Sequence, residues 1–288
     1  LKIKVNAHVQ KINFLGKKAI SVSFYDNGKL TTIKANKEIL LSAGSIGSPH
    51  ILQVSGIGEG KKLKSHGIPI VHELVGVGKN LQDHLMFRPV YKVKNLKSLN
   101  GKINSLFGNL LIGLEYIFNQ SGPMTMGASQ VCGFLKSDSS RATPNLQFHV
   151  QPISTDILGA TKMHDFDGIT PTIANIRPTS RGEINITSND IRDNPKIKMN
   201  YLSTQEDRDV AAKSLKIVRK IMLETNAFKK YEPEEYRPGV HITDDNELVQ
   251  AGSEHTQTIF HPVGTCKMGN GEDAVVDEKL KVRGIENL

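Results

Sequence analysis

The chain has 288 residues, a net charge of +8 and two cysteines. Its length is enough for one large or two ordinary domains. No apolar run reaches the roughly 18 residues of a membrane span. The lysines are scattered and Trp is absent, so we interpret the charge as a solvated surface and expect no nucleic-acid partner. The two cysteines argue against a disulfide framework or metal site and favour the cytoplasm, with peripheral membrane attachment left open.

The first forty residues predict a small antiparallel meander that leads into a buried strand. Polar and apolar residues alternate over residues 1–26, and Asp26-Asn27-Gly28-Lys29 is typical of a hairpin turn. A further strand is expected from Leu30 to Ala35. Ile39-Leu40-Leu41 is too short for a helix and is bounded by small residues, so we expect a short buried strand there.

The next stretch favours a nucleotide-binding turn. Side-chain bulk is small over Ser42-Ala43-Gly44-Ser45, which lets another group approach the backbone. Pro49 suits the first turn of a helix, with Ser48 as its N-cap. A strand, a glycine turn and a helix N-terminus together can hold a phosphate or ribose at the edge of a parallel sheet. The same layout also occurs in α/β proteins without a nucleotide.

The middle of the chain predicts a different architecture. Mostly apolar residues over 103–118 and an amphipathic stretch over 204–223 predict two helices. Strands are expected at 87–93, 130–135, 145–151, 172–177, 182–187 and 197–199. Strands backed by a helix, without βαβ alternation, predict an α+β domain on an antiparallel sheet.

Three long motifs stand out in the chain: GSIGSPHILQVSGIG (44–58), GVGKNLQDH (76–84) and HPVGTCKMG (261–269). They resemble motifs of the glucose-methanol-choline (GMC) family of FAD-dependent oxidoreductases, which oxidise alcohols. The first motif resembles the second signature of the family. GVGKNLQDH (76–84) and HPVGTCKMG (261–269) resemble its later segments, in the expected order and with RPTSRGEINITS (177–188) between them. The resemblance covers nearly the whole chain. NLQFHVQP and EEYRPG look most like the bacterial branch that oxidises choline or aliphatic alcohols.

The resemblance implies a domain plan and a cofactor. An α/β, Rossmann-like FAD-binding domain would comprise residues 1–84 and 255–288, and a substrate domain residues 85–254. The residue matching Val9 would contact the adenine through its backbone, which is also compatible with an ordinary strand position. The other cofactor contacts that we expect are Ala43, Gly44, Ser45, Gly78 and Asn80.

His261 is the candidate catalytic base. Oxidation of an alcohol moves a hydride to the flavin and a proton from the hydroxyl to a base, and a neutral histidine suits the second task. A histidine between apolar neighbours is, taken alone, more often a core residue. The resemblance favours the catalytic role, as the base itself or as a partner that positions the hydroxyl.

Three further residues are expected to contact substrate: Gln130, His149 and Phe260. In choline-oxidising relatives a glutamate lies in the segment matching Gln130. A neutral amide there loses the attraction for a quaternary cation, so choline is less favoured. His149 resembles a further pocket residue, although a surface-facing strand histidine is an equal interpretation. The first choice of substrate is a primary aliphatic or aromatic alcohol, oxidised to an aldehyde.

Other functions remain open. The electron acceptor could be oxygen, a quinone or another carrier. The protein could instead be a choline dehydrogenase, an inactive relative that serves as a binding module, or a flavin-dependent enzyme resembling hydroxynitrile lyases. Because Leu1 is not Met and both ends interrupt strand patterns, we expect a fragment that lacks the GxGxxG region and the extreme C-terminus. Such a fragment is expected to be inactive by itself.

Overall fold

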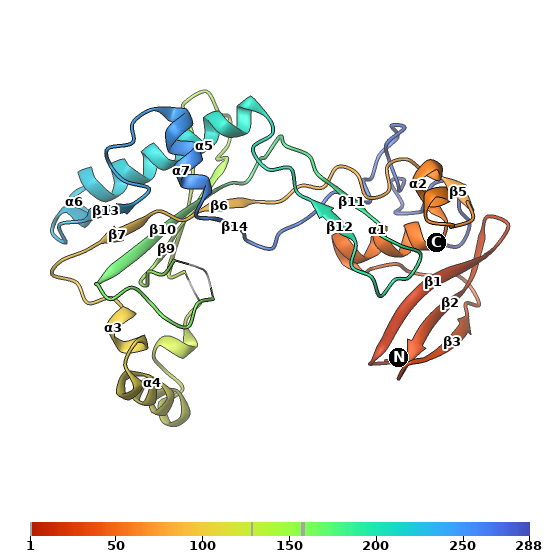
Figure 1. The fold of residues 1–288 in the computed structure, drawn as a ribbon, viewed down its shortest axis with the longest axis horizontal. Coiled ribbons are helices and arrows are strands. Elements are labelled where there is room, and N and C mark those ends of the chain that lie inside the picture. The colour runs from red at the N-terminus through yellow and green to blue at the C-terminus, as the bar shows by residue number, and fades with distance from the viewer. Residues whose placement is uncertain (1, 128, 157–158) are drawn as a thin grey trace. The chain divides into compact units, whose positions relative to one another are not determined.

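The computed structural model describes residues 2–127, 129–156 and 159–288, which form two compact units (Figure 1). Unit 1 comprises Leu1–Asp83, Ser180–Tyr201 and Pro262–Leu288. Unit 2 comprises His84–Thr179 and Leu202–His261. Each unit has its own hydrophobic core, so each is described by itself.

Unit 1 opens with the predicted meander. Strands β1 (Ala7–Leu15), β2 (Lys18–Asp26) and β3 (Lys29–Lys34) pair antiparallel in chain order. Asn27 and Gly28 have φ values of 49° and 84°, the left-handed conformations that a tight hairpin between right-twisted strands needs. The predicted hairpin is therefore confirmed.

The rest of unit 1 consists of short elements around one core. They are α1 (Gly44–Val54), β4 (Ile57–Gly58), α2 (Gly60–Ser65), β5 (His72–Glu73), β11 (Glu183–Asn185) and β12 (Lys196–Lys198). Strands β4 and β5 are parallel, whereas β11 and β12 are antiparallel. The core contains Leu52, Ile57, Leu63 and Val275.

Helix α1 begins earlier than predicted. Ala43 is its N-cap and Pro49 lies inside the helix, so the prediction of Ser48 as N-cap was wrong. Pro49 has no N–H for the carbonyl of Ser45, four residues earlier. The buried hydroxyl of Thr265 donates to that carbonyl instead. A residue far along the chain thereby permits a proline that the local pattern assigns to the first turn.

The predicted strand at Ile39-Leu40-Leu41 was also wrong. The segment has no strand assignment, and Leu40 is 81% exposed. Ile39 is buried and donates its N–H to the carbonyl of Asn287. An apolar run becomes a strand only where a neighbouring strand pairs with it, and the described residues supply no such ladder here.

Unit 2 is built on a seven-stranded sheet that is antiparallel at every pairing. Its order is β13-β7-β10-β6-β14, and β9 joins β10 to β8. The bounds are β6 (Leu85–Phe87), β7 (Val90–Lys92), β8 (Val131–Leu135), β9 (Leu146–Gln151), β10 (Gly168–Asn175), β13 (Glu234–Arg237) and β14 (Thr256–Thr258).

One face of this sheet packs against α5 (Gln205–Arg219) and α7 (Asp245–Ser253). Phe87, Phe148 and Ile173 meet Leu215 and Leu248 in the core. Helix α5 matches the predicted amphipathic helix. It begins after Thr204, whose side chain accepts a hydrogen bond from the N–H of Asp207 as N-cap. It continues as a π-helix over Lys220–Glu224, followed by α6 (Asn226–Lys229).

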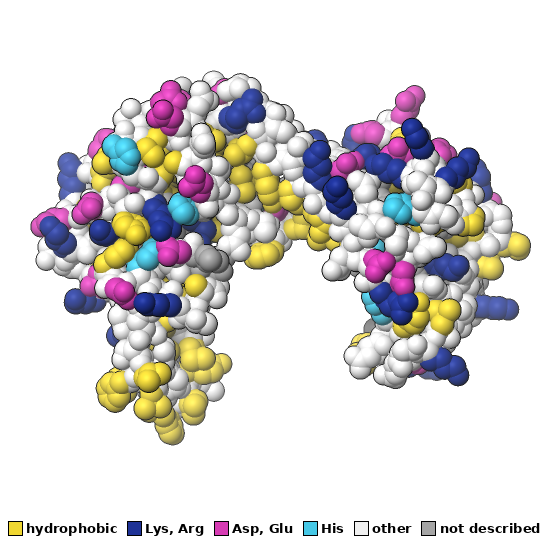
Figure 2. Space-filling view, in the orientation of Figure 1, with side chains coloured by type: hydrophobic (Ala, Val, Ile, Leu, Met, Phe, Trp, Pro, Cys, Tyr) yellow, Lys and Arg dark blue, Asp and Glu magenta, His cyan; other side chains and the backbone are white. Residues whose placement is uncertain are grey.

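The predicted apolar helix forms, but none of its residues is buried. After α3 (Asn100–Ile103), α4 (Leu106–Asn119) begins close to α3, where a Cβ added to Gly108 would lie 2.2 Å from the carbonyl of Lys102. A 3-10 turn follows at Pro123–Thr125. One face of α4 exposes a stripe of large apolar side chains (Figure 2): Leu106, Phe107, Leu110, Leu111, Leu114, Ile117 and Phe118. Among the described helices, none combines the length and apolar character needed to cross a bilayer.

The two units differ from the predicted domains in two places. Residues 180–201 join unit 1, because the buried amide of Gln53 donates to Ile184 (2.9 Å) and accepts from the N–H of Ile186 (2.8 Å). The chain returns to unit 1 at Pro262 rather than at residue 255, because β14 pairs with β6.

Candidate active site

His261 lies beside His84 in unit 2. The Nδ1 atoms of the two rings are 3.2 Å apart, and the rings meet edge to face with centroids 5.3 Å apart. His84 immediately precedes β6 and His261 follows β14, and these two strands are paired. The N–H of Ile259 donates to the carbonyl of His84 at 3.4 Å, which continues the pairing toward the two histidines. Sheet register therefore joins residues 177 positions apart.

A backbone turn at Phe260 precedes the catalytic candidate. Phe260 has φ 61°, a left-handed conformation that costs a non-glycine residue roughly 1–2 kcal/mol. Its N–H donates to the hydroxyl of Thr258 at 2.9 Å, which helps to hold the turn. The predicted substrate residue Phe260 thus directs the chain into His261, and its own side chain is 71% exposed.

The contact between the two Nδ1 atoms constrains the proton positions. Only one of the two can carry the shared proton while both rings are neutral. When His261 donates from Nδ1, its Nε2 carries a lone pair that can accept a proton. After that protonation, His261 still donates from Nδ1 to His84, so the hydrogen bond persists and becomes charge-assisted. The pair is therefore suited to a base that gains and loses one proton.

His149 lies on β9 near the same pair. Its ring is half-buried, and burial followed by the charge of His261 lowers its pKa. Its cross-strand partner on β8 is Cys132, which places both side chains on one face of the sheet. Gln130 precedes β8, donates its N–H to Val150 and its side-chain amide to the sulfur of Met126. The structure thus brings His149 toward His261 and leaves the Gln130 side chain exposed.

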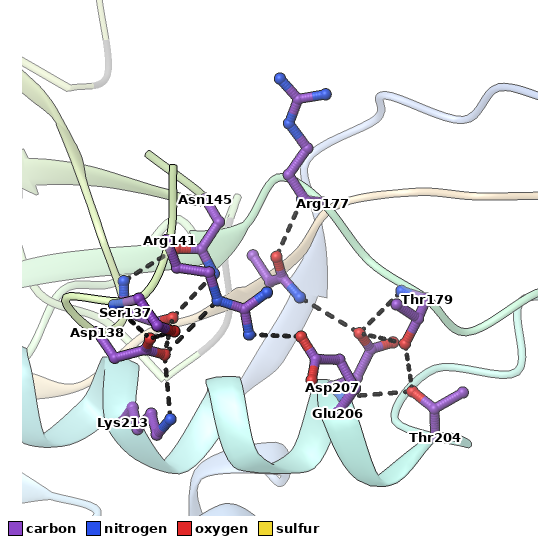
Figure 3. A network of polar contacts seen from close by, with 12 residues as sticks. Ser137, Asp138, Arg141, Asn145, Arg177, Thr179, Thr204, Glu206, Asp207 and Lys213 are labelled. Atoms are coloured by element: carbon purple, nitrogen blue, oxygen red, sulfur yellow. Dashed lines mark hydrogen bonds and ion pairs between the residues drawn. The ribbon is translucent and has the colours of Figure 1, made fainter. Parts of the chain in front are cut away.

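The loop between β8 and β9 is fixed on α5 by a polar network (Figure 3). Arg141 pairs with Glu206, and Lys213 with Asp138 at 3.1 Å. Asp207 accepts from the N–H and hydroxyl of Thr179. This network holds the hairpin that carries His149.

The predicted cofactor residues lie in unit 1. Ala43 and Gly44 are exposed at the N-terminus of α1, and no side chain caps that helix. Gly44 has φ 75°, and a Cβ added there would meet nothing within 4 Å. Uncapped N–H groups beside open space suit the phosphate or ribose oxygens of a nucleotide. On this observation Ala43, Gly44 and Ser45 fit FAD.

The loop that contains Gly78 and Asn80 is fastened to the segment after His261. Gly78 donates its N–H to the carbonyl of Thr265 (2.9 Å), and Asn80 donates its side-chain amide to that of Gly264 (3.1 Å). The Nε of Arg181 donates to the side-chain oxygen (Oδ1) of Asn80 at 3.0 Å. A Cβ on Gly78 would lie 2.2 Å from the carbonyl of Ile184. Close packing within unit 1 thus explains this glycine without a cofactor.

Val9 lies beside an irregularity in β1. The pairing with β2 shifts between Val9 and Lys11, so Gln10 has no cross-strand partner there. The side-chain oxygen of Gln10 is buried and lacks a hydrogen-bond partner among the described residues. Bulges free backbone groups from a ladder, which is compatible with a backbone contact to a base at Val9.

Sequence reasoning missed His84. It is the last residue of the GVGKNLQDH motif, but only Gly78 and Asn80 of that motif were predicted as site residues. The motif's terminal histidine was the available signal. What the sequence could not supply was the pairing of β6 with β14, which brings His84 to His261.

Comparisons with known proteins point to one family. Two family models described as GMC oxidoreductase match residues 1–86 and 178–288. The whole chain is 38% identical to the oxygen-dependent choline dehydrogenase of Pectobacterium carotovorum, covering 51% of that protein. It is 40% identical to the enzyme of the same name from Proteus mirabilis, covering 52% of it. The chain thus spans about half the length of these curated relatives.

Solved structures share the fold. Formate oxidase of Aspergillus oryzae RIB40 superposes with a TM-score of 0.88 at 24% identity, over 98% of this chain and 54% of the other. Pyridoxine 4-oxidase from Mesorbium loti gives a TM-score of 0.80 at 23% identity, over 98% of this chain and 50% of the other.

Proposed function

The chain belongs to the GMC oxidoreductase family, whose enzymes bind FAD, and we propose that the full-length protein oxidises an alcohol to an aldehyde. The observation that carries this proposal is the hydrogen bond between His84 and His261. It gives His261 a protonation cycle suited to a general base, in the segment that the family model matches.

His261 takes the proton of the substrate hydroxyl on Nε2. His84 accepts the Nδ1 proton of His261 and stabilises the imidazolium that forms, so His84 is a positioning residue. The flavin, when bound, supplies the acceptor for the hydride that leaves the carbinol carbon. Ala43, Gly44 and Ser45 would hold the cofactor through the N-terminus of α1, with Val9 and Asn80 as further contacts. A separate electron acceptor would be needed to complete the reaction.

Choline is the second candidate substrate, because the relatives described above are named choline dehydrogenases. Against it, Gln130 is a neutral amide and provides no charge for a quaternary cation. Choline therefore belongs in the same substrate panel as the neutral alcohols.

The proposal is tested by anaerobic reduction of the flavin in the full-length, FAD-loaded protein. A primary alcohol should bleach the visible absorbance of the oxidised flavin, and His261→Asn should slow that reduction roughly 10²- to 10⁴-fold. His241→Gln, which changes an exposed histidine of the same unit, is the matched control and should reduce at the wild-type rate. Failure of every alcohol to reduce the flavin would contradict the proposal, and cyanohydrin cleavage on an oxidised flavin would favour the lyase.

A further inference from the structure

Arg88 is a buried cation that forms no ion pair with any described residue. It lies between β6 and β7 and is 6% exposed. Among the described residues no carboxylate pairs with its guanidinium, and its Nε proton has no acceptor. Burial alone lowers the pKa of Arg88. An unpaired buried charge is strongly unfavourable, so such a group is normally met by an anion or by ordered water.

Two more buried polar groups share the face of the sheet with Arg88. Phe87 pairs with Ile173 and Tyr91 with Ile169, so one unbroken register places Arg88 opposite Thr172. Thr172 is fully buried, and its hydroxyl lacks a partner among the described residues.

Gln151 completes the group. It pairs with Thr170, two residues from Thr172 on β10, and therefore points to the same face. It is 4% exposed, and its side-chain oxygen also lacks a partner among the described residues. We call Arg88, Thr172 and Gln151 the Arg88 cluster. Together they offer the guanidinium Nε–H, a hydroxyl and an amide oxygen, none of which has a hydrogen-bond partner among the described residues.

The described residues around the cluster include carboxylates, but none of them pairs with Arg88. His255 precedes β14 and comes opposite Arg88, because Thr256 pairs with Phe87. Burial lowers the pKa of His255, as do the charges of Arg237 and Arg88. The nearby carboxylate of Asp156 is already held by Arg237 at 2.6 Å and by His164 at 2.9 Å. The charge of Glu254 also acts on His255, but among the described residues no carboxylate forms an ion pair with Arg88.

The cluster is on the same sheet row as His149, the predicted substrate residue. Thr172 pairs with His149, whose pKa is lowered by burial and, because His261 is close enough, also by the charge of His261. Adjacent strands are about 4.8 Å apart, so the Cα atoms of Arg88 and His149, two strands apart, are separated by about 10 Å. His84, the hydrogen-bond partner of His261, lies four residues before Arg88 and points to the same face, about 13 Å away along the strand. A short carbon chain bridges such a span once the side chains are counted.

We propose that the Arg88 cluster binds a carboxylate of the substrate, so that the alcohol oxidised at His261 is a hydroxy acid and not a cation. The inference rests on the proposed function and specifies its substrate class. Arg88 forms paired N–H bonds to the carboxylate, which Arg does better than Lys because its donors form a planar fork. Thr172 donates a further hydrogen bond, and Gln151 accepts one from a second hydroxyl or an ordered water. The carboxylate itself is unchanged by the reaction.

The first test measures binding without turnover. Hexanoate, which has no hydroxyl to oxidise, should bind the full-length FAD-loaded protein in a calorimetric titration, whereas hexylammonium should not. Arg88→Met, which is similar in length and uncharged, should weaken hexanoate binding roughly 10- to 100-fold, the range for a hydrogen bond to a charged group. Arg177→Met, which changes an exposed arginine of the same unit, should leave the dissociation constant unchanged.

The second test measures specificity. The ratio of kcat/KM for 6-hydroxyhexanoate to that for 1-hexanol should exceed ten in the wild type and fall at least tenfold in Arg88→Met. If Arg88→Met does not fold, Thr172→Val should still reduce hexanoate affinity about fivefold. Turnover of 1-hexanol without any hexanoate binding would overturn the inference and leave the proposed function intact. Hexanoate binding without flavin reduction by any alcohol would support the carboxylate site and overturn the proposed function.

Discussion

The two faces of the seven-stranded sheet are built from alternate residues of the same strands, but one face is apolar and the other carries polar side chains. On one face Phe87, Ile173 and Phe148 pack against α5 and α7. On the other, Arg88, Thr172 and His149 stand in one row. Since adjacent residues on a strand point to opposite faces, one strand can carry a core side chain and a polar one side by side. The packed face stabilises the fold, which allows the other face to retain buried polar groups that lower stability and can bind a ligand.

The largest expected effect comes from a substitution that creates a cavity in the packed face. Ile173 is fully buried in the core, so Ile173→Ala should lower the free energy of unfolding by about 3 kcal/mol, through lost transfer free energy and a cavity. Urea denaturation of the full-length protein measures this change. A loss below about 1 kcal/mol would mean that this face is not the main source of stability in unit 2.

A smaller effect of opposite sign is expected one residue away. Thr172→Val is nearly isosteric and removes a buried hydroxyl that has no partner among the described residues. The same denaturation measurement should therefore show a gain of about 1 kcal/mol. If the variant is instead destabilised, a partner such as ordered water must already satisfy the hydroxyl in the free protein.

The smallest effect concerns pH, because the two histidines involved are only half-buried. Burial lowers the pKa of both His149 and His255 from the ordinary value of 6.5. As pH falls below about 6.5 the unfolded chain binds protons before the folded one, so stability decreases. The double variant His149→Gln, His255→Gln should lose less stability than the wild type between pH 7 and 5.5. Identical pH profiles of the two proteins would contradict this expectation.

Several features followed from the sequence because their causes are local. Asn27-Gly28 specified the hairpin, and Thr204 with the acidic first turn specified the start of α5. The three motifs together indicated the family to which the chain belongs, whereas the catalytic role of His261, which the HPVGTCKMG motif suggested, stays a prediction. Turn conformations, helix caps and sequence motifs all depend on residues within a few positions of one another, so the sequence alone is enough to predict them.

Other features were decided only by tertiary contacts. His84 meets His261 across 177 residues through the pairing of β6 with β14. Pro49 lies inside α1 because the hydroxyl of Thr265 replaces its missing N–H donor, and Leu40 is exposed because no neighbouring strand pairs with its segment among the described residues. Nothing in the sequence around Arg88 predicts its burial, which results from its position in the sheet. In each case the burial or pairing of a residue depends on a contact with a residue far away in the sequence. Local sequence patterns do not contain that information.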